Sequence, residues 1–125
     1  MTNMRDTGRS ILREVIGLEY FDKREASTNA FNTDARRFSE QYCFGEIWSR
    51  PGLERKTRSL ICIATMVALN RQHELRIHLG TALNNGATPD EIKEVLLQCI
   101  IYCGLPAGLE GFRVAEEVLD ARGLG

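Results

Sequence analysis

The sequence predicts an all-α protein with about six helices in a single domain spanning residues 1–125. Apolar residues recur mostly at helical spacing, whereas the alternation typical of strands is nearly absent. A chain of 125 residues is long enough for one domain with its own hydrophobic core. Apolar residues make up 43% of the chain and charged residues 26%, which is ordinary for a globular protein.

The first half of the chain predicts two helices and a loop. The segment GRSILREVIG places its apolar residues on one side of a short helix, and Gly17 should end that helix. A second helix is expected to begin near residues 27–29 and to run to about Phe44. Pro51 and Gly52 then interrupt the helical structure and lie in a charged loop.

The third predicted helix, residues 57–69, is apolar almost all round. Such a helix is expected to be central and covered on most sides. The fourth, which starts near Arg71, should end at the sequence Asn-Asn-Gly of residues 84–86, because this is a signal for a left-handed helix cap.

The start of the fifth helix is the best-defined boundary in the sequence. Thr88 can cap the helix, Pro89 suits its first position, and Glu91 completes a capping box. This helix should run to about Tyr102. The segment CGLPAG should end this helix, and a last helix is expected over residues 107–121.

Charge and hydropathy exclude several classes of partner. The net charge is −1 and both signs are interspersed, so we expect neither a nucleic acid nor a membrane surface as partner. The N-terminal segment lacks the apolar stretch of a signal peptide. The longest apolar run, residues 60–69, is about half the roughly 18 residues that a membrane span needs. We therefore expect a cytoplasmic protein.

Four cysteines stand in apolar or aromatic surroundings without the spacing CxxC. In a reducing compartment they are expected to be buried thiols that act as small hydrophobic residues. Cys99 and Cys103 would face each other one helical turn apart, which leaves a redox pair as an alternative. They also continue one apolar stripe, and this favours a place in the core.

The segment RQHELRIH, residues 71–78, holds both histidines of the chain. At about 100° per residue, Arg71, Glu74 and His78 fall within roughly 60° of one another. His78 thereby lies at the border between an apolar face and water. His73 points elsewhere, and the two histidines are five residues apart instead of four, so a metal site is disfavoured. An ordinary Glu74–His78 pair on a solvated face remains the alternative.

A second polar cluster surrounds the Pro-Gly loop, in the segment FGEIWSRPGLERKTR. Guanidinium groups bind small carboxylates through a two-pronged contact, so a loop rich in arginine suits an anion site. The alternative is a solvated charged loop that leads into a helix. If Arg58 lies near His78, the two clusters form one anion-binding pocket that contains an acid or base.

Long blocks of the chain resemble the carboxymuconolactone decarboxylase family. The blocks are DTGRSILREVIG, FGEIWSRPGLERKTRSL, ELRIHLGTALNNGATPDEIKEVLLQ and GLPAGLEGFRVAEEVL. The resemblance implies a six-helix fold shared with alkylhydroperoxidase-D-like proteins, in a homo-oligomer that is a hexamer or a trimer. It also implies decarboxylation of 4-carboxymuconolactone to the β-ketoadipate enol-lactone in protocatechuate catabolism, without cofactor or metal.

The resemblance, together with the two clusters, assigns roles to seven residues. We expect His78 to donate a proton, and a neighbouring carboxylate should keep its imidazole charged near neutral pH. The arginines should contact substrate carboxylates and a developing oxyanion, and the tryptophan should form an apolar wall. The predicted catalytic residues are His78, Glu74 and Glu46, and the predicted substrate-binding residues are Arg71, Arg58, Arg50 and Trp48.

Two alternatives to the decarboxylase remain open. The peroxidase branch of the superfamily carries CxxCxxxH, and aligning its histidine with His78 places Arg71 and Glu74 where its two thiols would be. A thiol-dependent peroxidase or reductase would then have to use Cys99 and Cys103. The other alternative is a protein that binds a small ligand and has lost the reaction.

Overall fold

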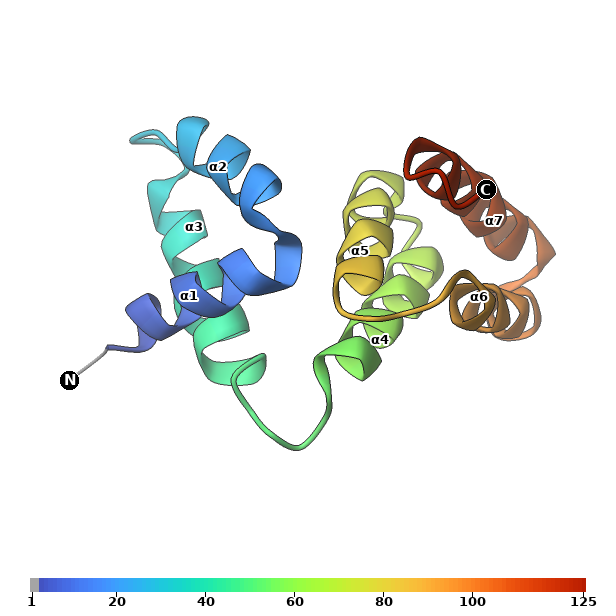
Figure 1. Ribbon diagram of the computed structural model, residues 1–125, viewed down its shortest axis with the longest axis horizontal. Coiled ribbons are helices and arrows are strands. Elements are labelled where there is room, and N and C mark those ends of the chain that lie inside the picture. Colours follow the sequence, from blue (N-terminus) through green and yellow to red (C-terminus); the bar gives the residue numbers. More distant parts are fainter. Residues whose placement is uncertain (1–2) are drawn as a thin grey trace. The chain divides into compact units, whose positions relative to one another are not determined.

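The computed structural model describes residues 3–125, and this part of the chain contains seven α-helices, one π-helix and no strand (Figure 1). The prediction of an all-α fold is confirmed. The chain divides into two compact units, Met1–Arg55 (unit 1) and Lys56–Gly125 (unit 2). None of the helices in the described range is both long and apolar enough to cross a bilayer.

Unit 1 contains more helices than predicted. Gly17, with φ of 89°, ends the first helix as expected, but the chain turns directly into another helix. The sequence gives little signal for this second helix, because Phe21 is its only buried residue. The elements of unit 1 are α1 (Met4–Ile16), α2 (Leu18–Ala26), α3 (Thr33–Phe38) and the π-helix η1 (Ser39–Ile47).

The helix predicted to begin near residues 27–29 begins later and changes type. The side chains of Asn29 and Asn32 hold a turn, in which the Asn29 amide donates to Asn32 Oδ1 at 2.9 Å and Asn32 Nδ2 donates to the Ser27 carbonyl at 3.0 Å. These local bonds compete with the helix, so α3 starts only at Thr33. The helix then widens into η1, a π-helix whose period differs from the 3.6 residues of an α-helix.

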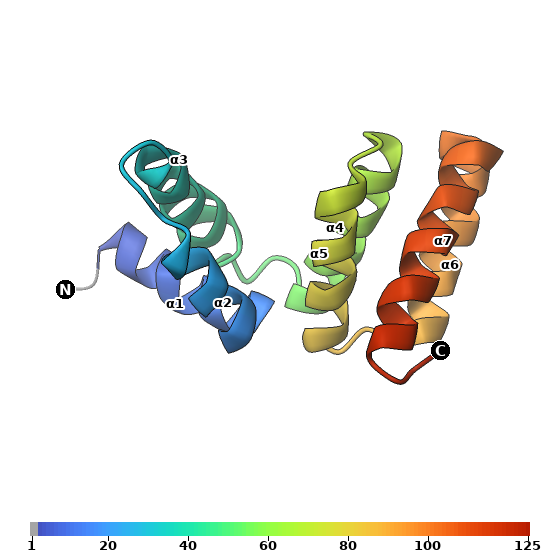
Figure 2. The same ribbon diagram turned by 90° about the horizontal axis from the view of Figure 1, so that it is seen from above.

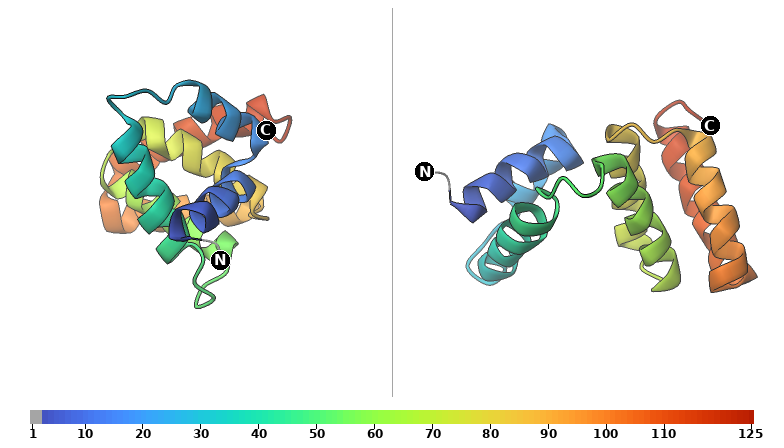
Figure 3. Two further views of the ribbon diagram at one scale, coloured as in Figure 1. Left: turned by 90° about the vertical axis from the view of Figure 1, so that its left-hand side faces the viewer. Right: turned by 90° about the horizontal axis from the view of Figure 1, so that it is seen from below.

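Two glycines allow α1 and η1 to lie side by side (Figure 3). A Cβ atom on Gly8 would lie 1.6 Å from the carbonyl oxygen of Glu40, and one on Gly45 would lie 2.4 Å from the carbonyl oxygen of Met4. Both distances are far below van der Waals contact. The absence of a side chain at these two positions is therefore what permits the crossing of the two backbones.

Unit 2 is a bundle of four helices around one hydrophobic core. In it α6 and α7 lie side by side (Figure 2). The helices are α4 (Arg55–Ala68), which begins at the boundary of the two units, α5 (Gln72–Asn84), α6 (Pro89–Cys103) and α7 (Leu105–Ala121). Each helix contributes to the core, whose largest fully buried side chains are Ile63, Leu79, Ile92, Leu96 and Val114.

The predicted boundaries around α6 are confirmed. Gly86 has a φ of 96°, as the left-handed cap requires. Thr88 Oγ1 accepts from the Glu91 amide at 3.1 Å, and Glu91 Oε1 accepts from the Thr88 amide at 2.9 Å, so the capping box forms. Gly104, with a φ of 97°, separates α6 from α7. The last helix starts at Leu105, two residues before the predicted start, because Pro106 is accommodated in its first turn.

The expectation that the apolar helix α4 is covered on most sides is wrong for this chain. Only Ser59, Ile63 and Val67 of α4 are buried, and Ile61 is 50% exposed. The helix packs through one face into the core of unit 2. Its other apolar face, with Ile61, is left on the surface.

Candidate functional site

The seven predicted site residues are distributed over both units. Three of them belong to unit 1, in or directly after η1, and four belong to unit 2, in or next to α4 and α5. Glu46 lies in η1, Trp48 and Arg50 follow it directly, Arg58 lies in α4, Arg71 precedes α5, and Glu74 and His78 lie in α5.

His78 lies at the border between the core of unit 2 and its surface, as predicted. Leu75 and Leu79 on the same helix are buried in the core, whereas Glu74 is exposed. The Nδ1 atom of His78 is buried, and it makes no hydrogen bond within the part of the chain that the structure describes. Buried polar atoms are nearly always paired, and exceptions often mark a catalytic group or the place of a ligand.

The protonation state of His78 differs from the expectation. Burial lowers the pKa of its imidazole below the ordinary value of 6.5, and the nearby charge of Glu74 opposes this only in part. Desolvation disfavours the charged ring more than one exposed carboxylate favours it. In the free protein His78 is therefore mainly neutral at pH 7.

Arg71 does not share the helical stripe that the sequence predicted. Its backbone, with φ of −106° and ψ of 79°, is not helical, and α5 begins only at the next residue. The Arg71 amide donates to the Met66 carbonyl at 2.9 Å, and its own carbonyl accepts from the Leu75 amide at 2.8 Å. The backbone is thus fixed between α4 and α5, and the side chain is exposed. The predicted spacing of 100° per residue around a helix therefore applies to Glu74 and His78, which both lie in α5, but not to Arg71.

Arg58 precedes the residue through which the start of α4 contacts the end of α5. The next residue, Ser59, is fully buried, and Asn85 Nδ2 lies 3.5 Å from Ser59 Oγ and donates to the Thr81 carbonyl at 2.7 Å. Asn85 follows His78 by seven residues, which is about two turns or roughly 10 Å along the helix axis. The start of α4 therefore contacts the end of α5, about two turns beyond His78, and the proximity of Arg58 to His78 remains a prediction.

The three predicted residues of unit 1 differ in their surroundings. Trp48 is 7% exposed and its ring stacks on that of Phe44, with 5.7 Å between the ring centroids. Its indole is mainly part of the interior of unit 1. Glu46 and Arg50 are exposed. The roles predicted for these three residues remain predictions.

A pocket of about 280 Å³ lies between α4 and α6 and contains none of the seven predicted residues. Its wall is mainly hydrophobic and includes Ile61, Val95 and Tyr102, together with the thiols of Cys99 and Cys103. The pocket lacks a charged side chain among its lining residues, so it does not have the character expected for a dicarboxylate site.

Cys99 of this pocket does not have the character of a reactive thiol. Cys99 is buried, whereas Cys103 is partly exposed. Burial, and then the proximity of Cys103, raise the pKa of the Cys99 thiol to about 11. The thiolate is the nucleophile in peroxidase chemistry, and little of it exists at pH 7 with such a pKa. This argues against the thiol-dependent alternative. The expectation of four buried cysteines is also wrong, since Cys43 is exposed.

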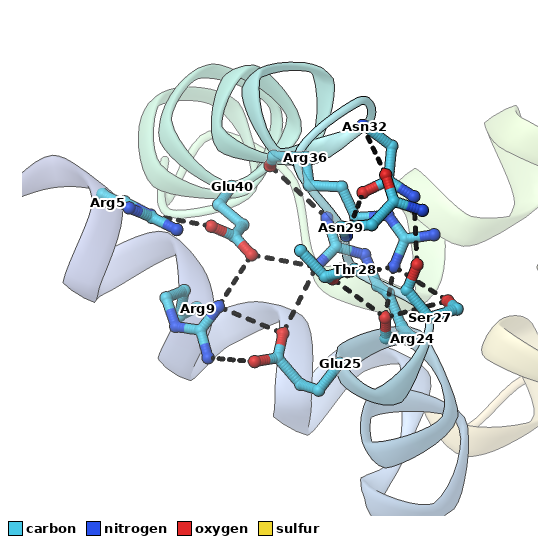
Figure 4. A network of polar contacts seen from close by, with 10 residues as sticks. All are labelled: Arg5, Arg9, Arg24, Glu25, Ser27, Thr28, Asn29, Asn32, Arg36 and Glu40. Carbon is cyan, nitrogen blue, oxygen red and sulfur yellow. Dashed lines mark hydrogen bonds and ion pairs between the residues drawn. The ribbon is translucent and has the colours of Figure 1, made fainter.

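Unit 1 contains a buried ionic cluster that the sequence analysis did not single out (Figure 4). Glu40 is 1% exposed and accepts from Arg5 Nε at 2.9 Å, from Arg9 Nη1 at 2.8 Å and from Arg24 Nη1 at 2.9 Å. Glu25 accepts a further bond from Arg9 Nη2 at 2.7 Å. These residues come from three helices and from distant positions in the chain, so no local pattern identifies them.

The sequence model of the carboxymuconolactone decarboxylase family matches residues 33–117. The chain belongs to this family. The resemblance stated from the sequence is confirmed. The matched range includes parts of both compact units, and the prediction of a single domain over residues 1–125 remains a prediction.

Three relatives show how broad the similarity is. A 4-carboxymuconolactone decarboxylase from Acinetobacter baylyi is 44% identical over 117 residues, which are 94% of this chain and 87% of the relative. A nitrosuccinic acid decarboxylase from Metarhizium robertsii is 31% identical over 115 residues, or 92% of this chain and 80% of the relative. An uncharacterized 15.0 kDa protein from Paracoccus denitrificans is 35% identical over 103 residues, or 81% of this chain and 75% of the relative.

Proposed function

We propose that this chain is a carboxy-lyase that decarboxylates 4-carboxymuconolactone to the β-ketoadipate enol-lactone, a step of protocatechuate catabolism. The observation that carries the proposal is the 44% identity to the Acinetobacter baylyi enzyme over 94% of this chain and 87% of that enzyme. A similarity of this extent covers every predicted site residue, not one motif alone.

The chemistry of the substrate explains what the protein has to supply. The lactone carries a carboxylate on a ring carbon and a second carboxylate on an acetate arm. When the ring carboxylate leaves as carbon dioxide, its electron pair moves through the ring double bond to the lactone carbonyl oxygen. The substrate thus provides its own electron sink, and the protein has to bind two carboxylates, stabilise the new oxyanion and protonate carbon.

His78 is the group that we assign to the protonation of carbon. Its Nδ1 is buried without a partner among residues 3–125, and its imidazole is mainly neutral in the free protein. A bound substrate with two negative charges favours the imidazolium. The proton would then be taken up together with the substrate and delivered to the ring carbon next to the lactone carbonyl.

Arg58 and Arg71 are the carboxylate-binding residues that we assign to unit 2. The firmer contact should be made to the acetate arm, because a strong contact to the departing carboxylate would stabilise the ground state and slow its loss. Glu74 lies one turn before His78 and modulates its pKa. The roles predicted for Glu46, Arg50 and Trp48, as a carboxylate that tunes His78, an anion contact and an apolar wall, remain predictions.

The proposed reaction has a direct test. Purified protein mixed with 4-carboxymuconolactone should accelerate the loss of the lactone, with one carbon dioxide released for each lactone consumed. The control is the same solution without protein. A rate equal to that of the control would contradict the proposed function.

The substitution Arg58→Lys is expected to raise KM for the lactone by roughly tenfold, with a smaller change in kcat. Lysine keeps the charge but loses the two-pronged contact with a carboxylate. Steady-state kinetics measure both constants. The control is Arg76→Lys, since Arg76 is paired with Glu117 on α7 and should not contact the substrate. An unchanged KM would show that Arg58 does not bind the substrate.

We also propose that the protein is a cytoplasmic homo-oligomer, a hexamer or a trimer. Residues 95–109 include no charged residue, yet Ile101 is 77% and Tyr102 82% exposed. Interface centres are depleted of charged residues and enriched in aromatic ones such as tyrosine. Light scattering after size exclusion should give a mass of three or six chains. The variant Ile101→Lys should shift it to a smaller species, and a monomeric wild-type protein would contradict the proposal.

A further inference from the structure

The substrates named for two of the relatives contain the same chemical fragment. Nitrosuccinic acid is succinic acid with a nitro group on C2. In 4-carboxymuconolactone, one ring carbon carries a carboxylate, an acetate arm and the ring double bond. Both molecules are therefore succinates in which C2 bears a group that can accept an electron pair. The relatives that carry these names are 44% and 31% identical to this chain.

The residues of the candidate site are suited to this fragment and not specifically to a lactone ring. Arg58 and Arg71 offer guanidinium groups to carboxylates, and His78 offers an imidazole whose Nδ1 has no partner in the described part of the chain. None of these groups distinguishes a lactone carbonyl from a nitro group, because both become anionic oxygens that accept hydrogen bonds or neutralising charge.

We propose that this chain also decarboxylates 2-nitrosuccinate, and that its site selects succinates with an electron-accepting substituent on C2. This inference rests on the proposed function, because it assigns the same residues to both substrates. It extends that function from one lactone to a class of acyclic acids.

The proposed step is balanced without a further reactant. The bond between C2 and its carboxylate carbon breaks, and the carboxylate leaves as carbon dioxide. The electron pair stays on C2 and is delocalised onto the nitro group as a nitronate. One proton added to C2 then gives 3-nitropropanoate. No group is oxidised or reduced by an external partner, and the second carboxylate is unchanged.

The two carboxylates have separate parts in this step, and three compounds distinguish them. 2-Nitrosuccinate has both carboxylates and the electron acceptor. Succinate has both carboxylates but no acceptor, so it should bind without reacting. 2-Nitropropanoate has the acceptor and the departing carboxylate but lacks the second carboxylate, so it should react with a KM raised by roughly tenfold.

The test uses the full chain and measures carbon dioxide and 3-nitropropanoate from 2-nitrosuccinate. Equal amounts of the two products are expected, at a rate at least about tenfold above that without protein. Succinate should inhibit lactone turnover competitively. The variant Arg58→Lys should raise KM for the lactone and for 2-nitrosuccinate by similar factors, whereas Arg76→Lys should leave both unchanged.

The outcomes separate this inference from the proposed function. Turnover of the lactone without turnover of 2-nitrosuccinate would overturn the inference and leave the proposed function intact. Turnover of 2-nitrosuccinate alone would support the inferred activity and overturn the proposed lactone activity. Turnover of neither compound would overturn both.

Discussion

Replacement of Glu40 by alanine is expected to lower the free energy of unfolding by about 3–5 kcal/mol, the usual cost of removing one partner from a buried ionic cluster. The carboxylate is 1% exposed and accepts hydrogen bonds from Arg5, Arg9 and Arg24. Its removal leaves three guanidinium groups close together with much of their negative counter-charge lost. Urea unfolding followed by circular dichroism measures the change.

Glu25 provides the matched control for this experiment. Its side chain is 35% exposed, and it pairs with Arg9 at 2.7 Å. Because water can solvate the charges that Glu25→Ala leaves behind, this variant should cost clearly less than Glu40→Ala. Equal effects of the two substitutions would show that the burial of Glu40 is not what makes the cluster important.

The same carboxylate predicts a dependence of stability on pH. Burial alone would raise the pKa of Glu40, but the hydrogen bonds from Arg24 and Arg5 and the charge of Arg9 outweigh it, so the pKa lies below its ordinary value of 4.5. A carboxyl group with a lowered pKa stabilises the fold above pH 4.5, and this contribution is lost as the pH falls through the lowered value. The variant Glu40→Gln should lack that part of the acid sensitivity.

Most helix boundaries were predictable because they depend on local chemistry. The capping box at Thr88 and the left-handed glycines at positions 17, 86 and 104 are encoded within a few residues. The start of α3 was not predicted because the turn held by Asn29 and Asn32 competes with the helix. The widened turn of η1 accompanies the close approach of Gly8 to Glu40, a contact between residues distant in the sequence.

The candidate site was also predictable only in part. The position of His78 at the edge of an apolar face follows from helical periodicity alone. Its pKa could not be predicted, because the balance between burial and the charge of Glu74 depends on the atoms packed around the ring. The prediction for Arg71 was wrong in its geometry, since the helix begins one residue after it.

Replacement of His78 by alanine is expected to lower kcat for the lactone by about 10²-fold or more, the usual contribution of a general acid. The variant His78→Gln keeps most of the volume and a hydrogen-bonding group, so it separates the loss of the proton from a cavity in the core. His73 is exposed on the same helix, and His73→Ala is the control. Activity of His78→Ala within a few-fold of the wild type would exclude His78 as the acid.

The lowered pKa of His78 makes this prediction specific in its pH dependence. The profile of kcat/KM reports the free enzyme, in which burial holds the imidazole neutral above a pKa that lies below 6.5. If substrate binding requires uptake of a proton, kcat/KM should fall as the pH rises above that pKa. The bound dianion raises the pKa of the imidazole, so kcat should stay level to a higher pH, and KM should rise with pH.

Two measurements follow from this linkage between binding and protonation. Calorimetry with succinate, in two buffers that differ in their enthalpy of ionisation, should show uptake of a proton by the wild type and not by His78→Gln. The variant Glu74→Gln should move the fall in kcat/KM to lower pH, because it removes the charge that partly offsets burial. A kcat/KM profile for the wild type that is flat between about pH 5 and 8 would contradict the role of His78 as the proton donor.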